Sequence, residues 1–342
     1  MSKNERGVVG GDIGHSAVKC KAAGIFNGVH KRVSIMFPSI AIPALKIADE
    51  AGAERAKLDT VMVDGNPWFY GETARIQSMG AYASGLTASW IETKEHTALF
   101  LGMIQKLEQA GMKNPEESLF ILGLPTILHA TQKERLKQIV SVYAPKIEVL
   151  VAPQPMGALY ADMLTEDGNE KDGRSIAGES IGVIEIGFFT TDFLLLQHGD
   201  WTEQGCGSSS GVCMAAQHLA KLLESNHAIE ADLDECQATL INGRIANFGQ
   251  TINVEAEVGV SRDILADKII DDSDRLFSPI VRKLSSVIIA GGGAPLVYKE
   301  LKAKWPHANM ITDHRLAIAD GFCRLGSGIL LSRSQLNTNK SV

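Results

Sequence analysis

Two short segments place a carboxylate, a glycine and small hydroxyl residues inside otherwise apolar runs. Residues 8–20 are VVGGDIGHSAVKC and residues 183–196 are VIEIGFFTTDFLLL, so each reads as a strand, a turn and a second strand. Asp12 and Glu185 each stand two residues before a glycine of the turn. Such a turn suits the phosphate groups of a nucleotide, because glycine lets a ligand approach the backbone and the exposed N–H groups and hydroxyls donate hydrogen bonds.

The carboxylates themselves repel phosphate, so they fit this chemistry only with a cation between them and the ligand. Mg²⁺ is commonly held by one or two carboxylates, water and phosphate oxygens. We therefore expect Asp12 and Glu185 to bind Mg²⁺ through water from the two sides of a cleft, with Lys19 neutralising phosphate charge. The loop residues expected to contact the phosphates are Gly14, His15 and Ser16 in the first segment and Gly187, Thr190 and Thr191 in the second.

A third segment, residues 285–305, reads as a buried strand, three glycines and a helix that starts near Pro295. The glycines Gly291, Gly292 and Gly293 would let a flat or anionic ligand reach the backbone at the helix N-terminus. The segment matches neither the G-x-x-x-x-G-K-[ST] phosphate loop nor the G-x-G-x-x-G dinucleotide fingerprint.

Short β-rich runs alternate with amphipathic helical patterns, which predicts an α/β fold. Asp12 and Glu185 lie about half the 342-residue chain apart within segments of the same form, so we expect two related domains. The expected boundaries are residues 1–155 with a C-terminal helix at 322–335 for the first domain, 156–321 for the second, and a frayed tail at 336–342.

Composition limits the class of protein. The formal net charge of -7 and pI near 5.8 disfavour a broad surface for direct nucleic-acid binding. No run approaches 18 apolar residues, and no secretory leader is visible, so we expect a cytoplasmic protein without a membrane segment. The cysteines show no metal-binding or disulfide spacing and are expected to be buried, reduced thiols: Cys20, Cys206, Cys213, Cys236 and Cys323.

In this order and spacing, the three segments resemble the actin-like ATPase superfamily. The motifs DIGHSAVK, EIGFFTTD and AGGGAP carry the resemblance, with further matches at LGLPT (122–126), APQPMGALYA (152–161) and IADGFCRLG (318–326). Within the superfamily the chain looks most like plasmid-segregating actins of the ParM/StbA type. The resemblance implies two related domains of actin or ribonuclease H-like fold around a nucleotide cleft that binds ATP or ADP with Mg²⁺.

The same resemblance suggests two catalytic residues. Gln154 occupies the place where such proteins position the attacking water, and an amide can orient a water for in-line attack. Glu185 stands where the family usually has Asp, which puts the efficiency of hydrolysis in question more than nucleotide binding. Gly205 and Gly207, in the segment TEQGCGSSSGV (202–212), are expected to close over the nucleotide from the second domain.

The resemblance implies an ATPase that assembles head to tail into dynamic filaments of a plasmid-partition cytoskeleton. DNA would be reached through an adaptor protein at a centromere-like site. A small-molecule kinase of the sugar-kinase type is the alternative, and a chaperone-like or cell-division ATPase is a third. The sequence leaves open filament handedness and strand number, the choice between ATP and GTP, and whether Trp68, Phe69 and Tyr70 are core or contact surface.

Overall fold

The computed structural model describes residues 6–80 and 89–339, and the chain divides into two compact units. The first unit consists of Met1–Gly173 and Leu316–Val342, and the second of Arg174–Arg315. The sequence predicts that the chain passes from the first domain to the second at residue 156. In the structure it does so later, after Gly173, because helix α5 (Gln154–Met163) packs against helix α10 (Ala317–Asn339) and both helices belong to the first unit.

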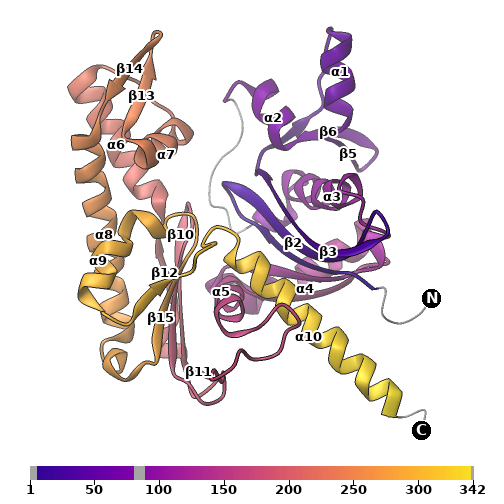
Figure 1. The fold of residues 1–342 in the computed structure, drawn as a ribbon. Coiled ribbons are helices and arrows are strands. Elements are labelled where there is room, and N and C mark those ends of the chain that lie inside the picture. Colours follow the sequence, from indigo (N-terminus) through magenta and orange to yellow (C-terminus); the bar gives the residue numbers. More distant parts are fainter. Residues whose placement is uncertain (1–5, 81–88, 340–342) are drawn as a thin grey trace. The chain divides into compact units, whose positions relative to one another are not determined.

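The main sheet of the first unit has the strand order β3-β2-β1-β7-β8 (Figure 1). Strands β1 and β2 form the hairpin expected for the first motif, while β1, β7 and β8 run parallel. The strand bounds are β1 Val8–Ile13, β2 Ala17–Phe26, β3 Val29–Pro38, β7 Leu119–Leu124 and β8 Glu148–Pro153.

The sheet of the second unit repeats this topology with the order β11-β10-β9-β15-β16, and β12 pairs with β10. An antiparallel hairpin, β9 and β10, is again followed by strands parallel to its first member. The internal repeat expected from the sequence is therefore present in the fold. The bounds are β9 Ile181–Ile186, β10 Thr190–Gln197, β11 Asp200–Trp201, β12 Gly207–Ser210, β15 Ser286–Ala290 and β16 Ala308–Met310.

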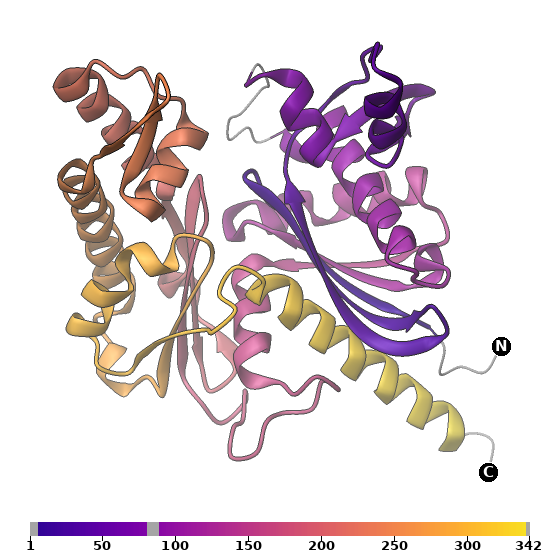
Figure 2. The same ribbon diagram turned by 45° about the horizontal axis from the view of Figure 1, so that its top comes forward.

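Helices cover both faces of the first unit's sheet. One core joins the sheet to α3 (Lys94–Gln109) and α4 (Thr126–Tyr143), and a second cluster joins its other face to α5 and α10. Figure 2 shows α10 lying across this sheet. The backbones of α5 and α10 touch, because a Cβ on Gly321 would lie 1.7 Å from the carbonyl oxygen of Gly157. Only glycine permits this approach.

A smaller sheet of order β4-β6-β5 extends the first unit, with helices α1 and α2 beside it (Figure 1). Trp68, Phe69 and Tyr70 lie on its central strand and are all buried, so this aromatic cluster is core and not a contact surface. The bounds are β4 Ala41–Pro43, α1 Glu50–Lys57, β5 Thr60–Val63, β6 Asn66–Tyr70 and α2 Gly71–Ser78.

One hydrophobic core of the second unit joins its sheet to four helices and to the hairpin β13–β14. The helices and hairpin strands are α6 Val212–His227, α7 Leu233–Asn242, β13 Arg244–Asn247, β14 Gln250–Asn253, α8 Glu255–Phe277 and α9 Ala294–Lys304. All five cysteines are free thiols; four are buried as expected, and Cys206 is half-buried. Among the described residues, no helix is long and apolar enough to cross a membrane.

Three local expectations need correction. The sequence predicts a helix over about 131–143, whereas helix α4 begins at Thr126, directly after Pro125. The segment 202–212, read as a loop, contains strand β12, because its serines pair in register with β10. Helix α10 continues to Asn339 where a frayed tail was expected from residue 336.

Candidate functional site

Asp12, Lys19 and Gln154 meet at one edge of the first unit's sheet. Asp12 is 1% exposed near the end of β1, and its carboxylate accepts hydrogen bonds from Lys19 Nζ at 2.9 Å and Gln154 Nε2 at 2.8 Å. Lys19 lies opposite Asp12 in the β1–β2 register, and Gln154 is the first residue of α5, directly after β8. These side chains gather because the parallel strands β1 and β8 end at the same edge.

The turn between β1 and β2 is fixed by aromatic packing. The His15 ring stacks on Trp90 with centroids 4.7 Å apart, and Trp90 meets His96 edge to face at 5.7 Å. Burial lowers the pKa of His15 to about 4, although the Asp12 charge opposes the shift, and burial lowers the pKa of His96 to about 3. Both imidazoles are therefore neutral near pH 7. The aromatic contact at His15 was not expected from the sequence.

Glu185 and Asp192 face each other across the β9–β10 hairpin. They are register partners on antiparallel strands, and they are 4% and 0% exposed. Asp192 accepts hydrogen bonds from Thr190 Oγ1 at 3.0 Å and from Ser208 Oγ at 2.7 Å. Two carboxylates on one face of a hairpin repel each other unless a donor or cation compensates. Ser208 was not singled out in the sequence, because its pairing with Asp192 depends on strand β12.

Thr191 lies differently from Thr190. Alternation along β10 turns it to the opposite face of the sheet, where it is fully buried and its hydroxyl donates to the carbonyl of Ser210 at 2.9 Å. Of the two threonines expected at the phosphates, Thr190 is the one whose side chain shares a face with the carboxylates.

The triple-glycine turn packs directly against the second loop. Gly291 has a φ of +93°, and a Cβ there would lie 2.3 Å from the carbonyl oxygen of Ile186 and 2.6 Å from Oε1 of Glu185. Gly293 N also donates to the Ile186 carbonyl at 2.9 Å. Two segments that were about 100 residues apart in the sequence therefore form one structure around Glu185.

The other face of this turn is open. A Cβ on Gly292 would meet no atom within 4 Å, and α9 starts two residues later with Pro295 in its first turn. A helix N-terminus beside exposed backbone is suited to bind an anion. His314 contacts the same turn at Gly291 and was not singled out from the sequence. Its Nδ1 lies 2.8 Å from the Gly291 carbonyl oxygen, and its own carbonyl oxygen accepts a hydrogen bond from Gly291 N.

The glycines of the 202–212 segment have different surroundings. Gly205 is buried against Leu195, where a Cβ would lie 2.2 Å from a side-chain carbon, while Gly207 is half-buried and begins β12. Gly205 therefore has a packing role in the second unit.

The carboxylates of Asp12 and Glu185 are of a type that can bind Mg²⁺ when phosphate oxygens complete its coordination. Within the described ranges, no group of three or more His, Cys, Asp and Glu side chains could hold a metal ion. Each unit does place a buried carboxylate beside a phosphate-type loop, Asp12 in the first and Glu185 in the second. One or two carboxylates complemented by phosphate oxygens is the usual protein environment of Mg²⁺.

Comparison with known families gives two matches that follow one another along the chain. Residues 10–157 match the N-terminal domain of actin-like proteins, and residues 183–303 match the C-terminal domain of archaeal MreB-like actin homologues. Together with the repeated sheet topology and the two hairpin loops, these matches show that the chain belongs to the actin-like superfamily. No curated protein sequence matches it.

Solved structures share the fold over nearly the whole chain. A ParM from a 15-stranded filament of Clostridium botulinum is 19% identical, with a TM-score of 0.72 over 94% of this chain and 99% of that one. The archaeal actin homologue Ta0583 in complex with ADP is 19% identical, with a TM-score of 0.65 over 95% and 99%. MreB5 of Spiroplasma citri bound to ADP is 14% identical, with a TM-score of 0.66 over 97% and 99%.

Proposed function

We propose that this protein binds ATP with Mg²⁺, hydrolyses it, and assembles head to tail into dynamic filaments that segregate plasmid or other DNA. The observation that carries the proposal is the pair of equivalent hairpins, each with a buried carboxylate at its turn. Two of the similar structures were solved with ADP, and a third is a filament, which supports the same assignment.

In this proposal the loops bind the phosphates through backbone donors and small side chains. The turn at Gly14–Ser16 and the turn at Gly187–Thr190 supply N–H groups and hydroxyls, and Lys19 supplies positive charge. The open glycine turn at 291–293 takes the adenosine. Asp12 and Glu185 would hold Mg²⁺ through water, and the bound ion would neutralise phosphate charge.

Gln154 is the residue we assign to the attacking water. Its carbonyl oxygen can accept a hydrogen bond from water while its Nε2 remains bonded to Asp12, which fixes the orientation of the amide. A neutral amide cannot remove a proton as a strong base does, so its contribution is to position the water. Glu185, one methylene longer than the usual Asp, is the second residue we expect to set the rate.

Filament growth would follow from nucleotide state. ATP would favour a conformation that joins copies by a heterologous contact, which generates an open filament, and hydrolysis would weaken that contact. An adaptor protein would connect the filament to DNA, which suits an acidic chain with a net charge of -7. As part of this proposal, we expect the protein to act in the cytoplasm.

The test is light scattering combined with phosphate release. Purified protein with ATP and Mg²⁺ should show scattering that rises and then decays as phosphate accumulates, and electron microscopy should show filaments. A protein that stays monomeric at high concentration with ATP would refute the filament proposal. ATP consumption that depends on an added sugar would instead identify a small-molecule kinase.

A further inference from the structure

The tip of the β13–β14 hairpin carries an aromatic side chain that the fold does not use. Phe248 is 101% exposed, and it occupies the two-residue turn Phe248–Gly249 between Asn247 and Gln250. Both turn residues have positive φ, +46° for Phe248 and +79° for Gly249. Such turns favour Asn, Asp or Gly at the first position, and a bulky residue there is strained. Phe248 thus costs stability locally and contributes no packing to its own unit.

The surroundings of the hairpin disfavour a lipid or nucleic-acid partner. Residues 230–263 hold seven carboxylates but only two arginines. Anionic membranes and nucleic acids attract the opposite charge pattern. A protein surface that accepts an aromatic side chain and tolerates nearby acidic groups is the better match.

The first unit of the same chain presents such a surface. A hollow of about 470 Å³ opens beside the second half of α10. It has the size of a ligand pocket. Its lining combines apolar side chains with two guanidinium groups and an imidazole: Val8, Leu330, Leu331, Arg6, Arg32 and His30. Glu166 and Asp167 also line it, and Arg32 forms an ion pair with Glu166. Guanidinium groups beside an apolar surface bind aromatic rings by stacking.

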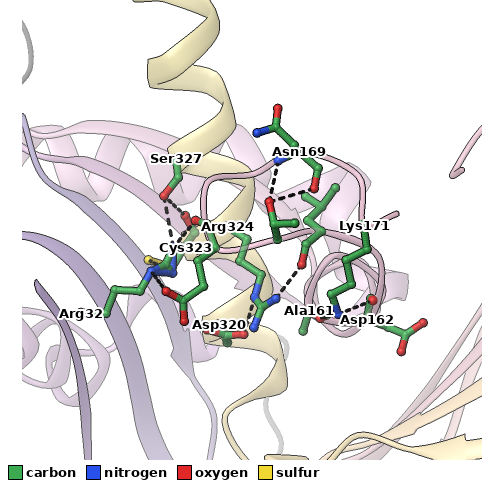
Figure 3. A network of polar contacts seen from close by, with 12 residues as sticks. Arg32, Ala161, Asp162, Asn169, Lys171, Asp320, Cys323, Arg324 and Ser327 are labelled. Atoms are coloured by element: carbon green, nitrogen blue, oxygen red, sulfur yellow. Dashed lines mark hydrogen bonds and ion pairs between the residues drawn. The ribbon is translucent and has the colours of Figure 1, made fainter. Parts of the chain in front are cut away.

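A polar network keeps this hollow in shape (Figure 3). Arg32 donates to the carbonyl of Glu166 and to Ser327 of α10, and Arg324 donates to the carbonyl of Leu164 while bonding Asp320. Lys171 donates to the carbonyl of Ala161 in α5 at 3.0 Å. The loop 164–171 that forms one wall is thus tied to β3, α5 and α10, so a partner meets a preformed site.

We infer that Phe248 of one subunit inserts into this hollow of a second copy as a filament contact. The inference rests on the proposed assembly into filaments. A protrusion on one unit and a different, complementary hollow on the other are what a heterologous contact requires. A central aromatic anchor in a preformed pocket is also the usual form of an interface hot spot.

The test compares critical concentrations for assembly with ATP and Mg²⁺ and uses matched variants. Phe248→Asn should raise the critical concentration roughly tenfold or more. Because Asn tolerates positive φ, the same variant should be at least as stable in urea as the wild type. Phe248→Trp should assemble normally. Leu331→Ser in the hollow should reproduce the defect, whereas Leu336→Ser, a more exposed leucine of the same helix outside the hollow, should not.

The outcomes separate the two proposals. If the wild-type protein assembles and either Phe248→Asn or Leu331→Ser assembles equally well, the contact is overturned and the filament function still stands. Vesicle binding that Phe248→Asn abolishes, with assembly unchanged, would assign the tip to a membrane and also overturn the contact. Wild-type protein that fails to assemble with ATP would refute the filament function and this contact together.

Discussion

Gln154 donates its side-chain amide to the carboxylate of Asp12 across 2.8 Å, which joins the first residue of α5 to the end of β1. Lys19 bonds the same carboxylate, and Nε2 is the atom that Gln154 uses to donate to it, so the carbonyl oxygen of Gln154 is the atom that would accept a hydrogen bond from the attacking water. This relationship leads to the first prediction.

Gln154→Ala should keep MgATP affinity within a few-fold and lower phosphate release by about a hundredfold, because the attacking water loses its orientation. Single-turnover phosphate release and equilibrium nucleotide binding measure the two effects separately. Gln154→Glu is the matched variant, since it keeps the shape of the side chain. Unchanged turnover in Gln154→Ala would exclude the positioning role.

Glu185 gives a second prediction, because it combines a buried carboxylate with a length one methylene greater than the family's usual Asp. Glu185→Gln should remove most of the Mg²⁺ dependence of ATP binding. Glu185→Asp should retain that dependence and alter the hydrolysis rate. The measurement is nucleotide affinity titrated against Mg²⁺. Equal Mg²⁺ dependence in wild type and Glu185→Gln would show that this carboxylate is not near the ion.

Gly291 and Gly292 provide a matched pair for stability. Gly291→Ala should destabilise the second unit by about 3 kcal/mol, because its φ of +93° is strained for alanine and the Cβ would meet the Ile186 carbonyl at 2.3 Å. Gly292→Ala should be close to neutral, since no atom lies within 4 Å of its Cβ position. Urea unfolding followed by circular dichroism checks both, and equal effects would contradict the packing described for Gly291.

His15 and His96 make stability depend on pH. Their pKa values, lowered to about 4 and about 3, lie below the ordinary value of 6.5, so the unfolded chain binds more protons on acidification. The stability they provide is complete above pH 6.5 and decreases from there towards pH 4, by about 1.4 kcal/mol per pH unit for each histidine. His15→Asn should flatten this slope in urea titrations between pH 6.5 and 4. An unchanged slope would mean that His15 does not contribute to the pH dependence of stability.

The sequence predicted the repeated hairpins because their signal is local. In each hairpin the apolar strands, the glycine turn and the carboxylate lie within a segment of 13 or 14 residues, and the fold confirms both hairpins and their repetition. The start of α9 at the triple glycine was also readable, since Pro295 stands in its first turn.

The contacts that the sequence did not predict join distant segments. Gly291 reaches Glu185 only after β15 has paired with β9, and Ser208 reaches Asp192 only through the pairing of β12 with β10. The stacking of His15 on Trp90 likewise joins residues that lie 75 positions apart in the sequence. The later boundary between the units has the same origin, because the contact of Gly157 with Gly321 joins residues about half the chain apart.

That contact also bears on the order in which the protein is made. The first unit needs α10, whose backbone packs against Gly10 of β1 and Gly157 of α5, yet α10 is synthesised only after the whole second unit. The second unit is a continuous segment, Arg174–Arg315, and can complete its core earlier. At ordinary translation rates its synthesis lasts on the order of ten seconds. During that interval the Asp12 and Gln154 segments are already made, but they await the helix that holds their sheet together.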